Sequence, residues 1–160
     1  MLTLRQMEEK DLPQVAAIEA SVFSQPWSEQ GFRDALMQKD CLYLVAAEEE
    51  KILGYCGLYQ SFDEADITNV AVMETERGKG VARAMLTELL EEGKKRGIAH
   101  FTLEVRISNT GALHLYEGLG FASAGVRKNF YDRPKEDAMI MWRHEALDAI
   151  PTVRSRSDCL

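Results

Sequence analysis

Residues 75–97, TERGKGVARAMLTELLEEGKKRG, decide the fold, because a glycine-rich turn leads here directly into a long amphipathic helix. Glycines at positions 78 and 80 permit positive φ and close approach of a ligand, and the N-terminus of a helix presents free N–H groups. Gly97 ends the helix after a basic last turn. The apolar stripe that predicts a helix over residues 81–95 consists of Val81, Met85, Leu86, Leu89 and Leu90. By itself the stretch fits a phosphate-binding turn and an ordinary tight β–α turn equally well.

Outward from this helix, hydrophobic periodicity predicts alternating strands and helices. Asp11 opens the first helix, in which Val15, Ile18 and Val22 share a face, and Ser28 caps the second. The other expected elements are strands over 2–7, 41–48, 52–62, 65–73, 100–108, 121–131 and 136–145, and a helix from Asn109, its cap, to Gly120. In strand 100–108, Phe101, Leu103, Val105 and Ile107 face one way, and Thr102, Glu104, Arg106 and Ser108 face the other. This order predicts an α/β or α+β fold with a mixed sheet.

Length and composition indicate one globular domain in a reducing compartment. The chain has 160 residues, of which 46% are hydrophobic and 28% charged. Its three cysteines show neither zinc nor disulfide spacing, and the N-terminus lacks the apolar segment of a signal peptide. The net charge of −7 argues against direct nucleic-acid binding and suits a basic partner. We expect a domain over 1–146, a polar, flexible tail over 147–160, no membrane segment and a cytoplasmic location.

Two common nucleotide motifs do not fit the glycine cluster. In a Walker loop a Ser or Thr follows the Gly-Lys pair, but here Gly80 follows Gly78-Lys79. In a dinucleotide fingerprint a third glycine is needed where this chain has Arg83. What remains is Arg77-x-x-Gly80-x-Ala82 after the strand NVAVM.

This pattern resembles the acyl-CoA pyrophosphate loop of the GCN5-related N-acetyltransferases, the GNAT family. The blocks TNVAV, RGKGVARAML, LEVRISNTGALHLYEGLGF and NFYDRPKEDAMIM follow in the order and spacing of that family and span nearly all of residues 1–145. The resemblance implies the GNAT acyl-CoA N-acyltransferase fold: a mixed, mostly antiparallel central sheet, splayed to hold acetyl-CoA and flanked by about four helices.

Within the family, the blocks PWSE, LEVRxSN, LYExLGF and EDAxxM look most like the RimI-like ribosomal-protein alanine N-acetyltransferases. That likeness implies an enzyme that acetylates the N-terminal alanine of small-subunit ribosomal protein eighteen. The amine would attack the thioester of acetyl-CoA directly. The implied partners are acetyl-CoA and a basic N-terminal peptide, with no metal. Two alternatives stay open: an acetyltransferase for lysine side chains or small amines, and a non-catalytic acyl-CoA-binding regulatory module.

The resemblance also assigns residues to acetyl-CoA. The backbone of Val70–Val72 would pair with the pantetheine arm, and the Val72 N–H would polarise the thioester carbonyl. The turn would bind the pyrophosphate through its N–H groups, with added charge from Arg77 or Lys79. The implied acetyl-CoA-binding residues are Val70, Ala71, Val72, Arg77, Gly78, Lys79, Gly80, Val81, Ala82 and Asn109.

Two side chains would carry the chemistry if the resemblance holds. Glu104 would be the general base, acting directly or through a water, and Tyr116 the general acid that protonates the departing thiolate. From the residues alone, Glu104 fits a solvated strand face or an ion pair with Arg106, and Tyr116 fits core packing.

Five residues are candidates for recognition of the acceptor peptide. The residues that could line a peptide groove near the first interhelix loop and the last hairpin are Trp27, Phe32, Tyr131, Glu136 and Asp137. Core packing of the aromatics and a solvated turn for the acids are equally good explanations.

Overall fold

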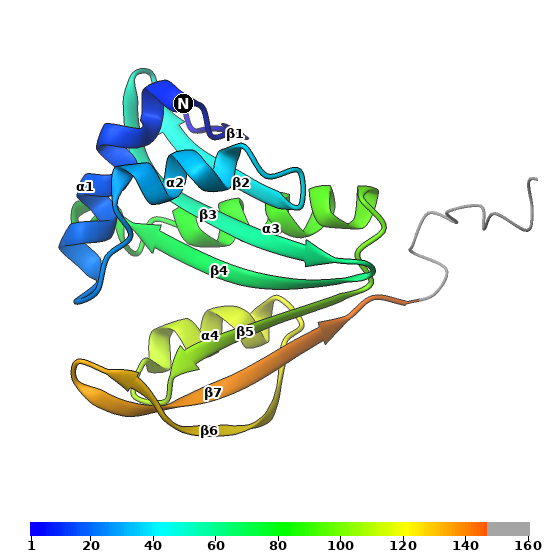
Figure 1. The fold of residues 1–160 in the computed structure, drawn as a ribbon. Helices are drawn as coiled ribbons and strands as arrows, with labels where there is room; N and C mark the ends of the chain where they lie inside the picture. Colours follow the sequence, from blue (N-terminus) through cyan, green and yellow to red (C-terminus); the bar gives the residue numbers. More distant parts are fainter. Residues whose placement is uncertain (147–160) are drawn as a thin grey trace, which may run out of the picture.

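The computed structural model describes residues 1–146, which form one seven-stranded sheet in the order β1-β2-β3-β4-β5-β7-β6 (Figure 1). The expected mixed sheet with four α-helices is confirmed. The elements are β1 (Thr3–Gln6), η1 (Glu9–Asp11), α1 (Leu12–Val22), α2 (Glu29–Leu36), β2 (Cys41–Glu48), β3 (Lys51–Ser61), β4 (Glu64–Val72), η2 (Glu74–Glu76), α3 (Val81–Lys95), β5 (His100–Arg106), α4 (Thr110–Gly118), β6 (Ala122–Asp132) and β7 (Lys135–His144). The expected tail, 147–160, lies outside the described residues.

The sheet is split between β4 and β5, its only parallel neighbours. These strands pair from Glu64 with His100 to Asp66 with Thr102, and the pairing stops there. Figure 1 shows the strands side by side at one end and apart at the other. Beyond Asp66, β4 keeps its antiparallel partner β3, but no strand within residues 1–146 pairs with its other edge. The divergence opens the middle of the sheet.

Two apolar clusters cover the two faces of the sheet. On one face, α3 packs its predicted stripe against β2, β3 and β5, and Tyr116 of α4 belongs to the same cluster. On the other face, α1 and α2 contribute Leu12, Val15 and Phe32. Alternate residues of β2 divide between the two clusters, as the two-residue period of a strand requires.

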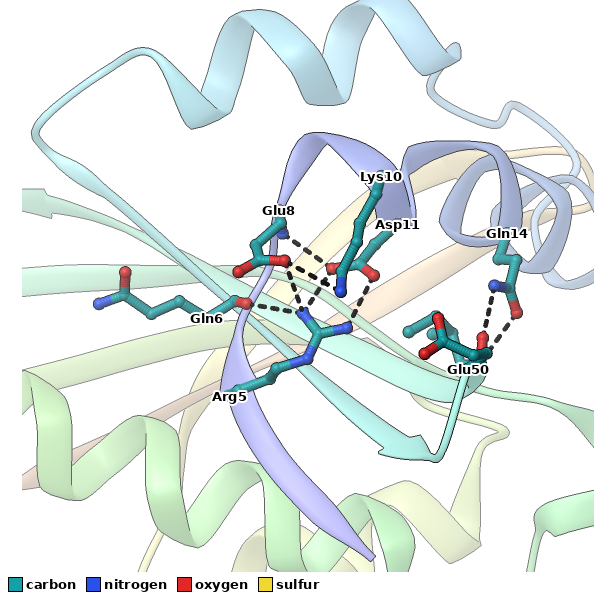
Figure 2. A network of polar contacts seen from close by, with 8 residues as sticks. Arg5, Gln6, Glu8, Lys10, Asp11, Gln14 and Glu50 are labelled. Carbon is teal, nitrogen blue, oxygen red and sulfur yellow. Dashed lines mark hydrogen bonds and ion pairs between the residues drawn. The ribbon is translucent and has the colours of Figure 1, made fainter.

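The predicted helix caps are present, with one change at α1. Ser28 and Asn109 accept hydrogen bonds from the N–H groups of Gly31 and Ala112, which confirms both as N-caps. Asp11 occupies the N-cap position of α1, but its carboxylate makes no bond to that helix. It instead accepts two hydrogen bonds from Arg5 and one from the Glu8 N–H (Figure 2). Asp11 therefore joins the start of α1 to β1.

The side chains of β5 alternate as expected only from His100 to Arg106, where the strand ends. Phe101, Leu103 and Val105 are buried, but Ile107 is exposed because the strand ends at Arg106. Thr102, expected on a polar face, is buried and donates its hydroxyl to the Met141 carbonyl of β7. The face that carries Glu104 is therefore only partly open to solvent. Within residues 1–146, no helix has the length and hydropathy needed to cross a membrane.

Candidate active site

A groove of about 820 Å³ occupies the gap between the diverging strands. Its walls come from four segments of the chain, namely residues 19–27, 66–70, 103–116 and 130–134. The β4 and β5 strands form its sides, and α4 contributes Ala112 and Tyr116. The end of α1 with the following loop, and the β6–β7 hairpin around Arg133, complete it. A groove in the split of a sheet is a common place for a ligand.

Six of the residues proposed from the sequence line this groove. They comprise both candidate catalytic residues, one residue of β4 proposed to bind acetyl-CoA, the N-cap residue of α4 and two aromatic residues. They are Glu104, Tyr116, Val70, Asn109, Trp27 and Tyr131.

The Glu104 side chain on β5 is 26% exposed, and it pairs with Arg127 of β6 at 3.7 Å between Oε1 and Nη2. The ion pair between Glu104 and Arg106 that the sequence suggested is not formed. Arg106 instead donates to the carbonyls of Arg133 and Pro134 and pairs with Glu136. Glu104 is thus a partly solvated carboxylate, and among residues 1–146 Arg127 is its one ion-pair partner.

Tyr116 is 8% exposed and packs edge-on against Phe121. Burial, followed by the nearby Tyr131, raises the pKa of the Tyr116 phenol far above its ordinary range. Its side chain lines the groove. The phenol is therefore protonated at neutral pH and can donate into the groove.

The open edge of β4 presents backbone donors to the gap. Met73 donates its N–H to the Leu53 carbonyl of β3, at 2.8 Å. Because N–H groups alternate along a strand, the Val72 N–H points toward the unpaired edge, as does that of Val70. An extended ligand could therefore pair with β4 here as an additional strand would.

The glycine turn has the geometry of an anion cradle. Gly78 and Gly80 have φ of 77° and 81°, and a Cβ at either position would meet nothing within 4 Å. Gly80 is the N-cap of α3 and no side chain caps that end, so the first amides of α3 stay available. Lys79 pairs with Glu76 at 3.2 Å, and Arg77 donates to the Val72 carbonyl. The turn follows β4 and does not line the groove itself.

Three of the residues proposed to recognise the acceptor peptide do not line the groove. Phe32 is 0% exposed and packs edge-on against Tyr43 and Tyr55 in the core. Glu136 accepts hydrogen bonds from the Ser108 N–H and from Arg106, which lower the pKa of its carboxyl. Asp137 accepts from the Asn129 N–H at 2.8 Å. The two acids therefore hold the β6–β7 hairpin in shape and do not line the groove.

One buried carboxylate in the groove wall, that of Glu19, did not emerge from the sequence analysis. A signal was present, because Glu19 lies four residues after Val15 and three before Val22, on the apolar stripe of α1. The part of the chain that the structure covers contains no cluster of three or more His, Cys, Asp or Glu suited to a metal ion.

Comparisons with known proteins agree with this geometry. The sequence profile described as "Acetyltransferase (GNAT) family" matches residues 11–121. The [Ribosomal protein bS18]-alanine N-acetyltransferase of Escherichia coli is 37% identical over 143 residues, which are 88% of this chain and 96% of that protein. A putative enzyme of the same description from Bacillus subtilis is 36% identical over 140 residues, 87% of this chain and 93% of that one. The crystal structure of the ribosomal-protein-S18-alanine N-acetyltransferase from Escherichia coli superposes with a TM-score of 0.84 at 36% identity, over 92% of this chain and 96% of that one.

Proposed function

Because the chain belongs to the GNAT acetyltransferase family, we propose that it transfers an acetyl group from acetyl-CoA to the N-terminal alanine of ribosomal protein bS18. The substrate is proposed from relatives that share more than a third of their residues with this chain over most of their length. Ribosomal proteins are made in the cytoplasm, so we place the reaction there.

The observation that carries the proposal is the meeting of Glu104 and Tyr116 in one groove. Direct acetylation of an amine needs a base for the amine proton and an acid for the departing thiolate. Glu104 takes the proton of the acceptor amine, directly or through a water. Tyr116, a phenol that is protonated at neutral pH, supplies the proton that the thiolate needs.

The donor side of the site rests on backbone groups. The glycine turn and the first amides of α3 suit the pyrophosphate of acetyl-CoA, because both glycines hold positive φ with open space around them. The unpaired edge of β4 at Val70 and Val72 suits the pantetheine arm, and the outward Val72 N–H suits the thioester oxygen. When bound, acetyl-CoA supplies the activated acetyl group.

An N-terminal amine suits this base better than a lysine does. A free α-amine has a pKa of about 7.7–8.0, whereas a lysine side chain has about 10.4. A single carboxylate can deprotonate the former with a much smaller energetic cost. The groove that contains Glu104 is also lined by the aromatic side chains of Trp27 and Tyr131, against which a chain end can pack.

A panel of three peptides tests the proposal. The first is a basic peptide beginning Ala-Arg, the second is the same peptide with its α-amine blocked, and the third carries an internal lysine. Free thiol released from acetyl-CoA is measured with a thiol-reactive dye. We expect turnover of the first peptide only. Turnover of the blocked or lysine peptide alone would identify a lysine acetyltransferase, and binding of acetyl-CoA without any turnover would identify a regulatory module.

A further inference from the structure

The carboxylate of Glu19 is buried without a cation to balance it. Glu19 lies near the C-terminal end of α1, is 2% exposed and lines the groove. Within residues 1–146 no lysine, arginine or histidine lies within ion-pair distance of it. A buried carboxylate is costly unless it is well hydrogen-bonded, so this one needs a structural or functional reason.

Three hydrogen-bond donors from three different elements converge on this carboxylate. Oε2 accepts the backbone N–H of Trp27, in the loop between α1 and α2, at 2.8 Å. Oε1 accepts the hydroxyl of Tyr55 on β3 and, at 3.5 Å, the side-chain amide of Asn69 on β4. The Glu19 side chain therefore joins the loop that carries Trp27 to the middle of the sheet.

The same network continues to an irregularity in β4. Asn69 accepts the hydroxyl of Tyr43 at 3.0 Å, and that hydroxyl lies 3.2 Å from the hydroxyl of Thr68. The β3–β4 pairing goes from Gly57 with Asn69 to Leu58 with Ile67, so Thr68 is the extra residue of a bulge. A Cβ on Gly57 would lie 2.1 Å from the Tyr43 ring, so glycine is what allows Tyr43 to reach the bulge.

We propose that Glu19 is a positioning residue for the acceptor, because it fixes the Trp27 wall of the groove against the β4 bulge. The inference rests on the proposed function, since it concerns the acceptor half of that site. Trp27, Thr68, Asn69 and Glu19 all line the groove, so a shift of the loop relative to the bulge changes the width of the acceptor passage. The glycine turn of the donor half does not line the groove.

A carboxylate performs this role where its amide analogue cannot. The three partners of Glu19 are all donors, and a carboxylate only accepts. In Glu19→Gln, the single amide oxygen cannot serve both the Trp27 N–H and the side that faces Tyr55 and Asn69, because the NH₂ group takes the other position. The substitution therefore weakens the charged link between the loop and the sheet while it preserves the shape of the side chain.

Steady-state kinetics of Glu19→Gln with the Ala-Arg peptide test the proposal. The matched control is Asp11→Asn, because Asp11 lies at the other end of the same helix (Figure 2), is also 2% exposed and does not line the groove. We expect Glu19→Gln to raise the KM for the peptide about tenfold, as loss of one hydrogen bond to a charged group predicts. The KM for acetyl-CoA should stay within about twofold in both variants, and the peptide KM should change only in Glu19→Gln. Equal peptide KM values in the two variants would overturn the proposal.

A second measurement does not depend on activity. In a Trp142→Phe background, Trp27 is the only tryptophan, and its quenching by acrylamide reports how open the loop is. Glu19→Gln should increase this quenching at a temperature at which circular dichroism shows the protein folded, and Asp11→Asn should not. Unchanged quenching in Glu19→Gln would overturn the proposal about Glu19, whether or not the protein is active. A wild-type protein that acetylates none of the peptides would count only against the proposed function. If Glu19→Gln does not fold, Tyr55→Phe removes one donor and should shift quenching and peptide KM in the same direction by a smaller factor.

Discussion

Burial decides what the Tyr116 side chain can do. It belongs to the apolar cluster on the α3 face of the sheet and also lines the groove. A tyrosine kept only for packing would function equally well as phenylalanine. A protonated phenol that lines the groove can instead deliver one proton to a leaving group there.

We therefore predict that Tyr116→Phe lowers kcat by about 100-fold, because it removes the general acid and keeps the ring. Steady-state thiol release with the Ala-Arg peptide measures the effect. The dissociation constant for acetyl-CoA, from calorimetry, and the melting temperature should stay close to the wild-type values. A normal kcat would leave Tyr116 with packing as its only role.

Asp11 gives a residue-scale prediction about stability. Burial opposes ionisation of this carboxyl, but hydrogen bonds from Arg5 and the Glu8 N–H outweigh it and lower the pKa of Asp11 (Figure 2). A lowered folded-state pKa adds stability that is present above the ordinary carboxyl pKa of about 3.9 and is lost as the pH falls below it. We predict that Asp11→Asn destabilises the protein at pH 7 and that the difference from wild type shrinks toward pH 3. Urea unfolding at several pH values measures it, and a pH-independent difference would contradict the explanation.

Single residues also show where sequence reasoning ends. Phe32 and Trp27 come from the same short segment, but Phe32 is on the buried side of α2 and Trp27 borders the groove. Which of them faces the ligand depends on how α2 packs against β2 and β3, and this is a tertiary property. The partners of Glu136 at Ser108 and Arg106 are 28 and 30 residues away in the sequence, so no local pattern could reveal them.

At the scale of elements, α3 was the most predictable part of the chain. Its range over residues 81–95, its apolar stripe and its glycine stop are all as expected, because a long period-3.6 pattern is a strong signal. The two glycines at its ends share one backbone conformation, with φ of 81° at Gly80 and 82° at Gly97. They differ in which end of the helix they border.

Alanine variants of Gly80 and Gly97 distinguish an effect on ligand binding from an effect of backbone strain. Alanine at either position should cost about 1–2 kcal/mol of stability, since both positions need a left-handed conformation. Only Gly80→Ala should also raise the KM for acetyl-CoA, by about tenfold or more, because its Cβ and the relaxed turn obstruct the anion cradle at the start of α3. Chemical unfolding and initial rates over a range of acetyl-CoA concentrations measure the two effects. If the two variants changed the acetyl-CoA KM equally, the turn would not be part of the donor site.

At the scale of the whole molecule, the groove depends on contacts that connect distant parts of the chain. Strands β4 and β5 pair over only three residues before they diverge, and the hydroxyl of Ser24 donates to the Arg133 carbonyl across 109 residues. Periodicity gives the strands but not the point at which their pairing stops. Only the family resemblance implied a splayed sheet, and the sequence contained no sign of the bridge between the first interhelix loop and the last hairpin.

The charge of the whole chain leads to a final prediction. The net charge is −7, and the groove is lined by Glu19, Glu104, Asp66 and Asp132 against Arg106 and Arg133. A basic acceptor peptide should therefore be attracted before it binds, and added salt should screen that attraction. We expect kcat/KM for the Ala-Arg peptide to fall about tenfold between about 50 mM and 500 mM salt, chiefly through KM. A peptide that keeps its first residue but has glutamines in place of its later basic residues should respond weakly. Equal salt dependence of the two peptides would show that the acceptor is selected at its N-terminal residue and not by its charge.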